Sequence, residues 1–373
     1  MSRFRGLTWD HPRGYNSLAE AASSVPDLIQ WGRQPLEGFE SRPIEEICAE
    51  YDVVVLDHPH LGDALGAACL QPLDKLIASE KLAAIRDRTI GPCFDSYVMD
   101  GHTWALPLDA AAQVSAGRLD LMNAPMPDSW TDVQHFAKGD AGFVLSLAGP
   151  HAFLSLLSMC ATFDERFGTI AQGLLEPHHD AAVALFLDLL FRSHPIGSIH
   201  NPIGILTAMA AGEGPTYCPL IFGYVPFAEE SAVEPVVFRN APSVGGARHA
   251  VLGGTGLAVT ARCVPDRELL DHLVWLMSAD VQADFLPRHS GQPSAEASWA
   301  SPALNGGNNG FYAHTLATLR HAFVRPRVPA IVPAQNRAAS WLRDLRGGPA
   351  PSASVVRDQV NRILAKETAD FGA

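Results

Sequence analysis

The first 57 residues alternate short apolar segments with segments that carry helix signals. Three segments, residues 4–9, 28–31 and 52–57, are apolar and short enough to be buried strands. The third reads Asp-Val-Val-Val-Leu-Asp, a continuous apolar run typical of a strand covered on both faces. This spacing leaves room for one helix between each pair of strands.

Helix signals fill both gaps. Asn16 and Ser17 are cap residues for a helix from Leu18 to about Ser24, and a second helix over 43–51 opens with Pro and acidic residues. The order βαβαβ predicts an α/β fold with a parallel sheet flanked by helices. Ligands of such sheets bind beyond the carboxyl ends of the strands.

Length and charge narrow the class of protein. A chain of 373 residues with 47% apolar residues can fill two hydrophobic cores. The formal net charge of -13 disfavours nucleic acid and anionic lipid as partners, because both require clustered Lys and Arg. No apolar run reaches the roughly 20 residues of a membrane-spanning helix. We therefore expect a small solute as the partner.

The rest of the chain predicts further elements and crossings between two lobes. A strand over 103–109 ends in a run of alanines, and the stretch 143–220 is largely helical. A buried strand follows over 218–224, and a helix over about 266–278. We expect four segments: 1–109 as the first part of lobe I, 110–242 as the first part of lobe II, 243–310 as a return to lobe I, and 311–373 as C-terminal helices packed mainly on lobe II.

Seven short motifs occur in a fixed order along the chain. They are Gly101-His-Thr-Trp-Ala-Leu-Pro107, Pro127-Asp-Ser-Trp130, Met209-Ala-Ala-Gly-Glu, Gly253-Gly-Thr-Gly-Leu-Ala-Val259, Trp275-Leu-Met-Ser-Ala-Asp-Val-Gln282, Gly291-Gln-Pro-Ser and Arg325-Pro-Arg-Val-Pro329. Each motif alone has low specificity, whereas their order over nearly the whole chain is specific. In this order the chain resembles the extracellular solute-binding proteins of ABC importers, which include the maltodextrin-binding proteins.

The resemblance implies a two-lobed, periplasmic-binding-protein-like fold in which each lobe is a mostly parallel sheet flanked by helices. It implies a ligand cleft between the lobes that closes by a hinge motion around a small polar solute. It also implies a monomer that needs no cofactor and delivers its ligand to an ABC permease. Because one fold hosts many functions, the transport role is implied by analogy.

The first candidate site residues follow the first two predicted strands. Trp9 could stack on a ring, and Arg13 could hold a carboxylate through two parallel hydrogen bonds. Asp10 and His11 lie between them, and Arg33 follows the second strand. The alternative is that Trp9 belongs to the core and Asp10 caps the next helix.

Further candidates end the third strand and lie at the family's ligand loops. A His-x-His pair suggests a metal ligand, but no third or fourth ligand is visible at suitable spacing, so we predict no metal. Asp109 is either a ligand contact at the hinge or a helix cap, and Gly253 and Gly254 would let backbone N–H groups approach a ligand. The remaining candidates in these positions are Asp57, His58, His60, Tyr224 and His289.

Two readings of the activity stay open. The main one is a binding protein for a sugar, a polyol or an organic or aromatic carboxylate. The alternative is a cytoplasmic enzyme on the same fold, acting without a cofactor as a hydrolase, transferase or lyase, with Cys93, His58 and Asp10 as candidate catalytic residues. A buried, inert Cys93 is the competing interpretation of that thiol.

The cysteines and the chain start bear on the compartment. The six cysteines contain no CxxC pair, and this usage suits a reducing compartment, although an even number leaves disulfides arithmetically possible. The sequence starts with Met and runs directly into the first predicted strand without a secretory leader. We therefore expect a cytoplasmic protein, or a periplasmic one if a leader precedes this sequence.

Overall fold

A computed structural model describes residues 2–139, 142–229 and 235–369. The chain divides into two compact units. Unit 1 contains residues 1–111, 253–304 and 327–332, and unit 2 contains residues 112–252, 305–326 and 333–373. The chain therefore passes between the units at 111/112 and 252/253, and three more times between 304 and 333. Each unit is described separately below.

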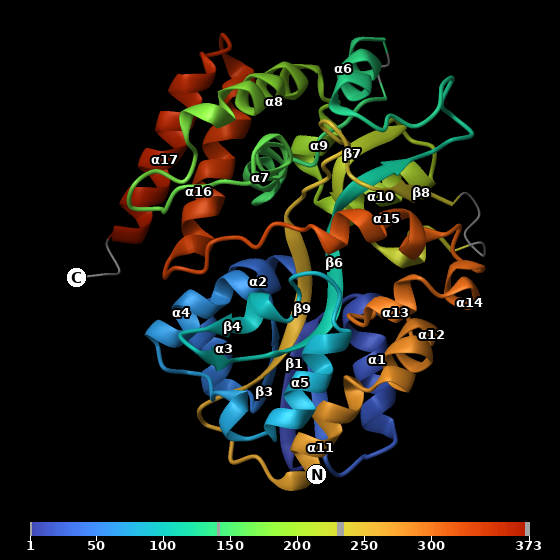
Figure 1. The fold of residues 1–373 in the computed structure, drawn as a ribbon, viewed down its shortest axis with the longest axis vertical. Coiled ribbons are helices and arrows are strands. Elements are labelled where there is room, and N and C mark those ends of the chain that lie inside the picture. Colours follow the sequence, from blue (N-terminus) through green and yellow to red (C-terminus); the bar gives the residue numbers. More distant parts are fainter. Residues whose placement is uncertain (1, 140–141, 230–234, 370–373) are drawn as a thin grey trace. The chain divides into compact units, whose positions relative to one another are not determined.

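The strands of unit 1 begin with the predicted βαβαβ order. Strands β1 (Phe4–Trp9), β2 (Ile29–Gln34) and β3 (Val53–Leu56) are parallel, with Phe4 opposite Ile29 and Gly6 opposite Val53. Figure 1 labels β1 and β3. Strand β9 (Leu252–Val259) pairs antiparallel with β3, so that Leu56 faces Gly256. Strands β4 (Val98–Met99) and β5 (His102–Thr103) form a separate hairpin.

Helices cover both faces of this sheet. The N-terminal ones are α1 (Pro12–Ser23), α2 (Leu36–Ser41), α3 (Ile44–Glu50), α4 (Leu61–Gly66) and α5 (Ser79–Arg88). The return segment adds α11 (Arg267–Leu276), α12 (Leu286–Arg288), α13 (Glu296–Trp299) and α14 (Pro302–Asn305). Short helical turns over 58–60, 73–75, 95–97 and 281–285 connect these elements.

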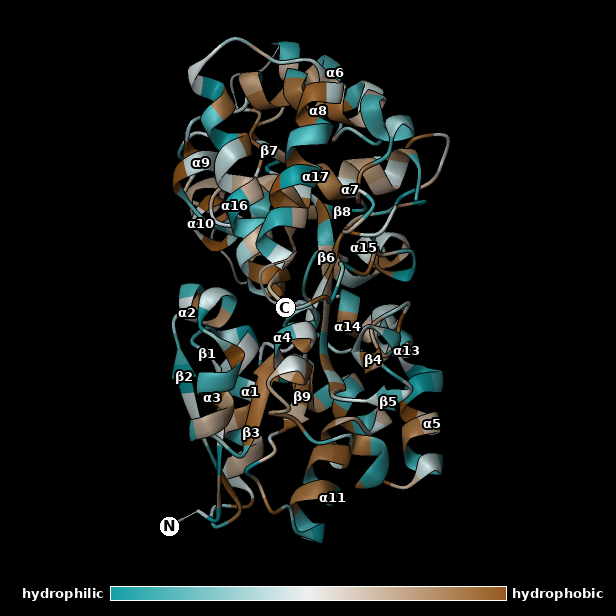
Figure 2. Cartoon of the chain, turned by 90° about the vertical axis from the view of Figure 1, so that its left-hand side faces the viewer, coloured by the Kyte–Doolittle hydropathy of each residue, from teal (hydrophilic) through white to brown (hydrophobic). Residues whose placement is uncertain are grey.

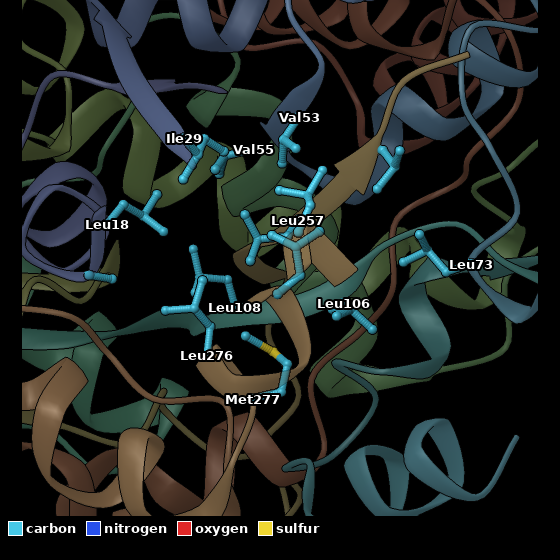
Figure 3. Packing of buried hydrophobic residues seen from close by; sticks show 14 of the residues in the cluster. Leu18, Ile29, Val53, Val55, Leu73, Leu106, Leu108, Leu257, Leu276 and Met277 are labelled. Carbon is cyan, nitrogen blue, oxygen red and sulfur yellow. The ribbon is translucent and has the colours of Figure 1, made fainter. Parts of the chain in front are cut away.

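The core of unit 1 lies on the two faces of β3. Val53 and Val55 pack into the cluster drawn in Figure 3, together with Leu106 and Leu257. Val54 and Leu56 point to the opposite face, into a second cluster with residues of α3 and α4. Since successive strand side chains alternate between faces, burial of both faces explains why this strand is apolar without interruption.

Unit 2 is built on the second half of the long strand β6 (Leu106–Gly117), whose twelve residues are all buried and whose first half belongs to unit 1. It pairs antiparallel with β7 (Tyr217–Phe222) and β8 (Val237–Arg239). The helices are α6 (Trp130–Gly139), α7 (His151–Phe163), α8 (Asp180–Arg192), α9 (Ile196–Ile199), α10 (Pro202–Ala210), α15 (Phe311–Arg320), α16 (Ile331–Asp344) and α17 (Ala353–Ala369). Short helical turns lie at 177–179, 225–227 and 345–347.

Hydropathy follows this architecture. In Figure 2 the apolar strand β3 is brown, while the outer faces of many helices carry teal, hydrophilic residues. Helix α7 is unusual because twelve of its residues, His151 to Thr162, are buried. Among the described residues, no helix has both the length and the apolar character that crossing a bilayer demands.

Two predicted element boundaries were wrong. Helix α1 starts at Pro12 rather than Leu18, because the His11 ring accepts a hydrogen bond from the backbone N–H of Arg13 and caps the helix there. The strand predicted to end at the alanine run continues through it to Gly117. Alanine has low strand propensity, and here the pairing with β7 and β8 overrides that preference.

Candidate functional site

The carboxyl ends of the three parallel strands bring together most of the predicted site residues of unit 1. Asp10 and His11 follow β1, Arg33 is near the end of β2, and Asp57 and His58 follow β3. Because β1 pairs with both other strands in parallel, these three ends lie at one edge of the sheet. This edge is called the strand-end site.

Arg13 and Asp109 form a buried ion pair beside the strand-end site. The Arg13 Nε donates to Asp109 Oδ2 at 2.8 Å, and the Arg13 Nη2 donates to the other carboxylate oxygen. Both side chains are 4% exposed. Such a two-point contact aligns the planar guanidinium with the carboxylate, so the Arg13 charge is matched within unit 1.

Arg33 is also matched by an acid, but at the surface. Its Nη1 lies 3.1 Å from Asp10 Oδ1, and both side chains are more than half exposed. The guanidinium lies 4.8 Å from the centre of the Tyr15 ring. An exposed pair of this kind holds its geometry weakly, which leaves the Asp10 carboxylate able to accept other hydrogen bonds.

The histidines of the site are largely buried. Burial and the nearby Arg13 lower the pKa of His11 to about 4, so the His11 ring is neutral at neutral pH. His58 is fully buried and His60 is 7% exposed. The backbone N–H of His58 donates to Asp57 Oδ1 at 2.9 Å, which fixes the turn after β3. This turn therefore presents a carboxylate that is 23% exposed.

Trp9 lies in the unit 1 core. It is 3% exposed, and its ring centre lies 5.2 Å from that of Phe39. A Cβ atom at Gly14 would lie 2.3 Å from the Trp9 ring, so the ring packs directly on the backbone of α1. The core interpretation of Trp9 given above agrees with this position.

Gly254 serves the packing of two strands. Its φ is +88°, and a Cβ atom there would lie 2.3 Å from the backbone oxygen of Asp109. Only a glycine allows β9 to approach β6 this closely in this conformation. Gly253 precedes it in the same strand.

The remaining predicted contacts lie elsewhere. His289 follows α12 in unit 1, where its ring centre is 4.7 Å from that of Phe285. Tyr224 is 6% exposed and lies in unit 2, directly before a short helical turn. Among the described residues, no group of three His, Cys, Asp or Glu could hold a metal ion.

Sequence reasoning missed the side chains that hold β6 in unit 1. Gln292 Nε2 donates to the oxygen of Ala110 at 3.1 Å, and Ser294 Oγ donates to the oxygen of Pro107 at 2.5 Å. Gln282 Oε1 in turn accepts from the backbone N–H of Ser294. The Gly-Gln-Pro-Ser motif was recognised in the sequence. Its partners on β6 lie about 180 residues away, and no sequence pattern indicated them.

Comparison with known proteins identifies the fold. No family model and no curated protein matches the sequence. The sugar-binding protein MalE from Xanthomonas citri is 15% identical with a TM-score of 0.76, over 99% of this chain and 98% of that one. An ABC transporter solute-binding protein from Agrobacterium radiobacter K84, in complex with ribitol, is 18% identical with a TM-score of 0.77, over 97% and 98%. Maltose-bound MalE3 from T. maritima is 17% identical with a TM-score of 0.76, over 99% of both chains.

The chain has the solute-binding-protein fold. The fold class predicted from the sequence is confirmed. Identities of 15–18% show the fold alone, so the ligand and the role of this solute-binding fold depend on its own residues.

The residues of the enzyme alternative have contrasting environments. Cys93 is 2% exposed, and burial together with the Asp109 charge raises its pKa. A thiol held protonated is a poor nucleophile. His58 is fully buried, whereas the Asp10 side chain is 54% exposed. These environments favour binding over covalent catalysis.

Proposed function

We propose that this protein binds one small, neutral, polyhydroxylated molecule, a sugar or a polyol, at the strand-end site. The observation that carries the proposal is the Arg13–Asp109 pair. A ligand carboxylate would have to compete with Asp109 for the Arg13 guanidinium, and this exchange would leave Asp109 buried without its counterion. A neutral hydroxyl group does not displace Asp109 from Arg13, so its binding leaves no buried charge without a counterion.

The other charges at the site support the same ligand class. Arg33 is paired with Asp10, and the His11 ring is neutral because its pKa is lowered to about 4. Asp10 and Asp57 keep partly exposed carboxylates, which accept hydrogen bonds from sugar hydroxyls. Structural neighbours were solved with ribitol, D-mannitol and maltose, which are all neutral.

Matched pairs of neutral and acidic ligands test this proposal. Ribitol is compared with ribonate, and mannitol with mannonate, by thermal shift and by calorimetric titration. At a neutral ligand concentration of 100 times Kd, linkage predicts a stabilisation of about 2.7 kcal/mol. For a chain of this length this corresponds to a rise in melting temperature of roughly 3–4 °C, and the acids should give none. Stabilisation by the acids alone would overturn the proposal.

A pair of carboxylate variants locates the site. Asp10→Asn removes a charged acceptor at the carboxyl end of β1, whereas Asp27→Asn changes an exposed acid before the amino end of β2. A hydrogen bond to a charged group contributes about 1.5–3 kcal/mol. We expect Asp10→Asn to raise Kd at least about tenfold and Asp27→Asn to leave it unchanged. Equal effects would place the ligand elsewhere.

We further propose that the protein supplies its ligand to an ABC-type importer, with a hinge motion on binding, which requires that it lies outside the cytoplasmic membrane. The alternative is a cytoplasmic binding protein without the importer role. The importer role is supported by the ABC transporter neighbours. The cytoplasmic alternative is supported by the six free cysteines, since reducing compartments keep thiols unpaired. In the importer role, deletion of the gene should abolish uptake of the labelled ligand, and cell fractionation should recover the protein from the periplasm. Unchanged uptake together with recovery among cytoplasmic markers would favour the cytoplasmic alternative.

A further inference from the structure

Two of the six free cysteines meet in unit 1. Cys48 lies on α3 and Cys69 lies three residues after the end of α4. The Cys48 and Cys69 side chains lie close enough for the two thiols to interact. Both side chains pack in the apolar cluster that also contains Leu61 and Leu70. The two sulfur atoms are thus adjacent without being bonded.

The two thiols differ in access. Cys48 is 3% exposed, whereas Cys69 is only half-buried. The interaction with Cys48 lowers the pKa of Cys69, and the same interaction together with burial raises the pKa of Cys48. An accessible cysteine with a lowered pKa beside a second, shielded thiol is the arrangement found in reactive redox pairs.

The other four cysteines lack this arrangement. Burial raises the pKa of Cys93, Cys160, Cys218 and Cys263. All six cysteines lie in the described part of the chain, and Cys69 is the one whose pKa is lowered. The chain therefore offers four matched thiols as internal controls.

The backbone holds Cys69 in place. Its N–H donates to the oxygen of Ala64 at 3.0 Å, and its oxygen accepts from the N–H of Ala261 at 2.8 Å. The next residue, Leu70, forms a bridge with Thr260. Cys69 is thus fixed between α4 and the residues after β9, so its sulfur stays beside α3.

We propose that Cys48 and Cys69 form a redox modification site that low-molecular-weight disulfides, such as oxidised glutathione, convert into an intramolecular disulfide. The Cys69 thiolate attacks one sulfur of the oxidant, breaks its S–S bond and releases one thiolate. Cys48 then loses its proton and attacks the Cys69 sulfur, which releases the second thiolate. The protein loses two electrons and two protons, and the oxidant becomes two thiols.

This bond would cross-link a segment that carries the strand-end site. Residues 48–69 include β3, the turn with Asp57 and His58, and all of α4. Asp63 of α4 also accepts a hydrogen bond from the N–H of Ala330, which ties this segment to the last part of unit 1. Closing this loop restricts the unfolded chain, so we expect the oxidised protein to melt several degrees higher.

The test uses the full, reduced chain incubated with oxidised glutathione under native conditions. Intact mass should fall by two hydrogens, and peptide mapping should recover one linked pair containing Cys48 and Cys69. Cys48→Ala should instead stop at one glutathione on Cys69. Cys69→Ala should stay unmodified, and Cys263→Ala should behave as the unaltered protein. Persistence of six free thiols, or linkage through another cysteine, would overturn the proposal.

Circular dichroism checks that each variant folds, and Cys48→Ser replaces Cys48→Ala if the latter does not. Oxidation should raise the melting temperature of the unaltered protein and leave that of Cys69→Ala unchanged. An equal rise in both would show that the stabilisation has another cause. No sugar or polyol takes part in these measurements, so their result is independent of the proposed ligand.

Discussion

Two buried side-chain contacts on the long strand β6, one in each unit, are of different kinds. In unit 1 the buried contact is ionic, because Arg13 and Asp109 are both 4% exposed and bound through two atoms. In unit 2 the corresponding contact is neutral: Ser158 Oγ donates to Gln113 Oε1 at 2.6 Å, and both residues are fully buried. Both Asp109 and Gln113 belong to the long strand β6.

The neutral groups of unit 2 form a stripe on α7. His151, Ser155, Ser158 and Thr162 recur every three or four residues and therefore share one face of the helix. Ser155 donates to the oxygen of Ser146, and Ser158 also accepts from the N–H of Val251. The stripe thus connects α7 to β6 and to the residue before β9 through direct side-chain hydrogen bonds.

This difference has energetic consequences. Breaking a buried ion pair leaves one charge without its counterion, whereas breaking a neutral hydrogen bond leaves only a dipole unpaired. Unit 1 should therefore be more sensitive to single substitutions at its buried contact. Acid should destabilise unit 2 down to a lower pH, because the folded pKa is about 3 for the buried His151 of unit 2 and about 4 for His11 of unit 1.

The largest expected effect comes from Arg13→Met. The variant keeps the length of the side chain but leaves the Asp109 carboxylate buried without a counterion. We expect a loss of about 3–5 kcal/mol in the free energy of unfolding, measured by urea denaturation. Arg33→Met, at the exposed pair with Asp10, should cost at most about 1 kcal/mol.

A double variant separates charge from packing at this site. In Arg13→Met with Asp109→Leu, both charges are gone and the volume is largely kept. Replacing a whole buried ion pair with apolar residues is often neutral. The double variant should therefore be clearly more stable than Arg13→Met alone. If it is not, packing of the Arg13 stem rather than the ion pair accounts for the loss.

Acid should act next most strongly, through His151. Burial, with smaller contributions from Arg325 and Arg343, lowers its pKa from 6.5 to about 3 in the folded protein. The unfolded state then binds more protons between these values, so the free energy of unfolding falls as pH falls below 6.5. The loss is about 1.4 kcal/mol per pH unit, or about 3 kcal/mol by roughly pH 4.5.

Two glutamine variants measure this slope. His151→Gln has no imidazole to protonate in the unfolded state. The slope of its free energy of unfolding against pH should therefore be smaller than that of the unaltered protein by about 1.4 kcal/mol per pH unit. His11→Gln is the counterpart in unit 1. The difference in slope between this variant and the unaltered protein should vanish below about pH 4, because the folded pKa of His11 is about 4. An unchanged slope in His151→Gln would show that other groups control acid unfolding.

Gly254→Ala should have a somewhat smaller effect. The added Cβ would lie 2.3 Å from the backbone oxygen of Asp109, and φ at this position is +88°. Overpacking and the left-handed conformation together should cost about 2–3 kcal/mol in urea denaturation. Gly101→Ala is the matched control, since its φ is +78° and no atom lies within 4 Å of the added Cβ. Similar losses in both would mean that strain alone matters.

The sequence predicted the strands better than the helix starts. The apolar run of β3 was correct to within one residue, because a strand buried on both faces has an unmistakable composition. The start of α1 was missed because His11, an uncommon cap, acts there, although Pro12 in the first turn was an available signal. Local composition thus predicts a strand whose side chains are all buried more accurately than it predicts the residue at which a helix begins.

The site was predictable in position but not in pairing. The strand-end rule brought Asp10, Arg33 and Asp57 to one edge of the sheet. It could not show that Arg13 binds Asp109, because these residues are 96 positions apart and a single sequence carries no record of such contacts. For this reason the sequence suggested some anionic character for the ligand, whereas the paired charges favour a neutral one.

The smallest effect is expected for Ser158→Ala in the neutral stripe of unit 2. The variant removes the donor to Gln113 Oε1 and the acceptor for the N–H of Val251. An unsatisfied buried group costs about 1–3 kcal/mol. Because α7 can relax around the smaller side chain, we expect a total loss of about 2 kcal/mol in the free energy of unfolding. Ser155→Ala, which loses one bond to a backbone oxygen, should cost about 1 kcal/mol. If Ser158→Ala destabilises the protein as much as Arg13→Met does, the ionic contact has no special weight, and the contrast between the two units fails.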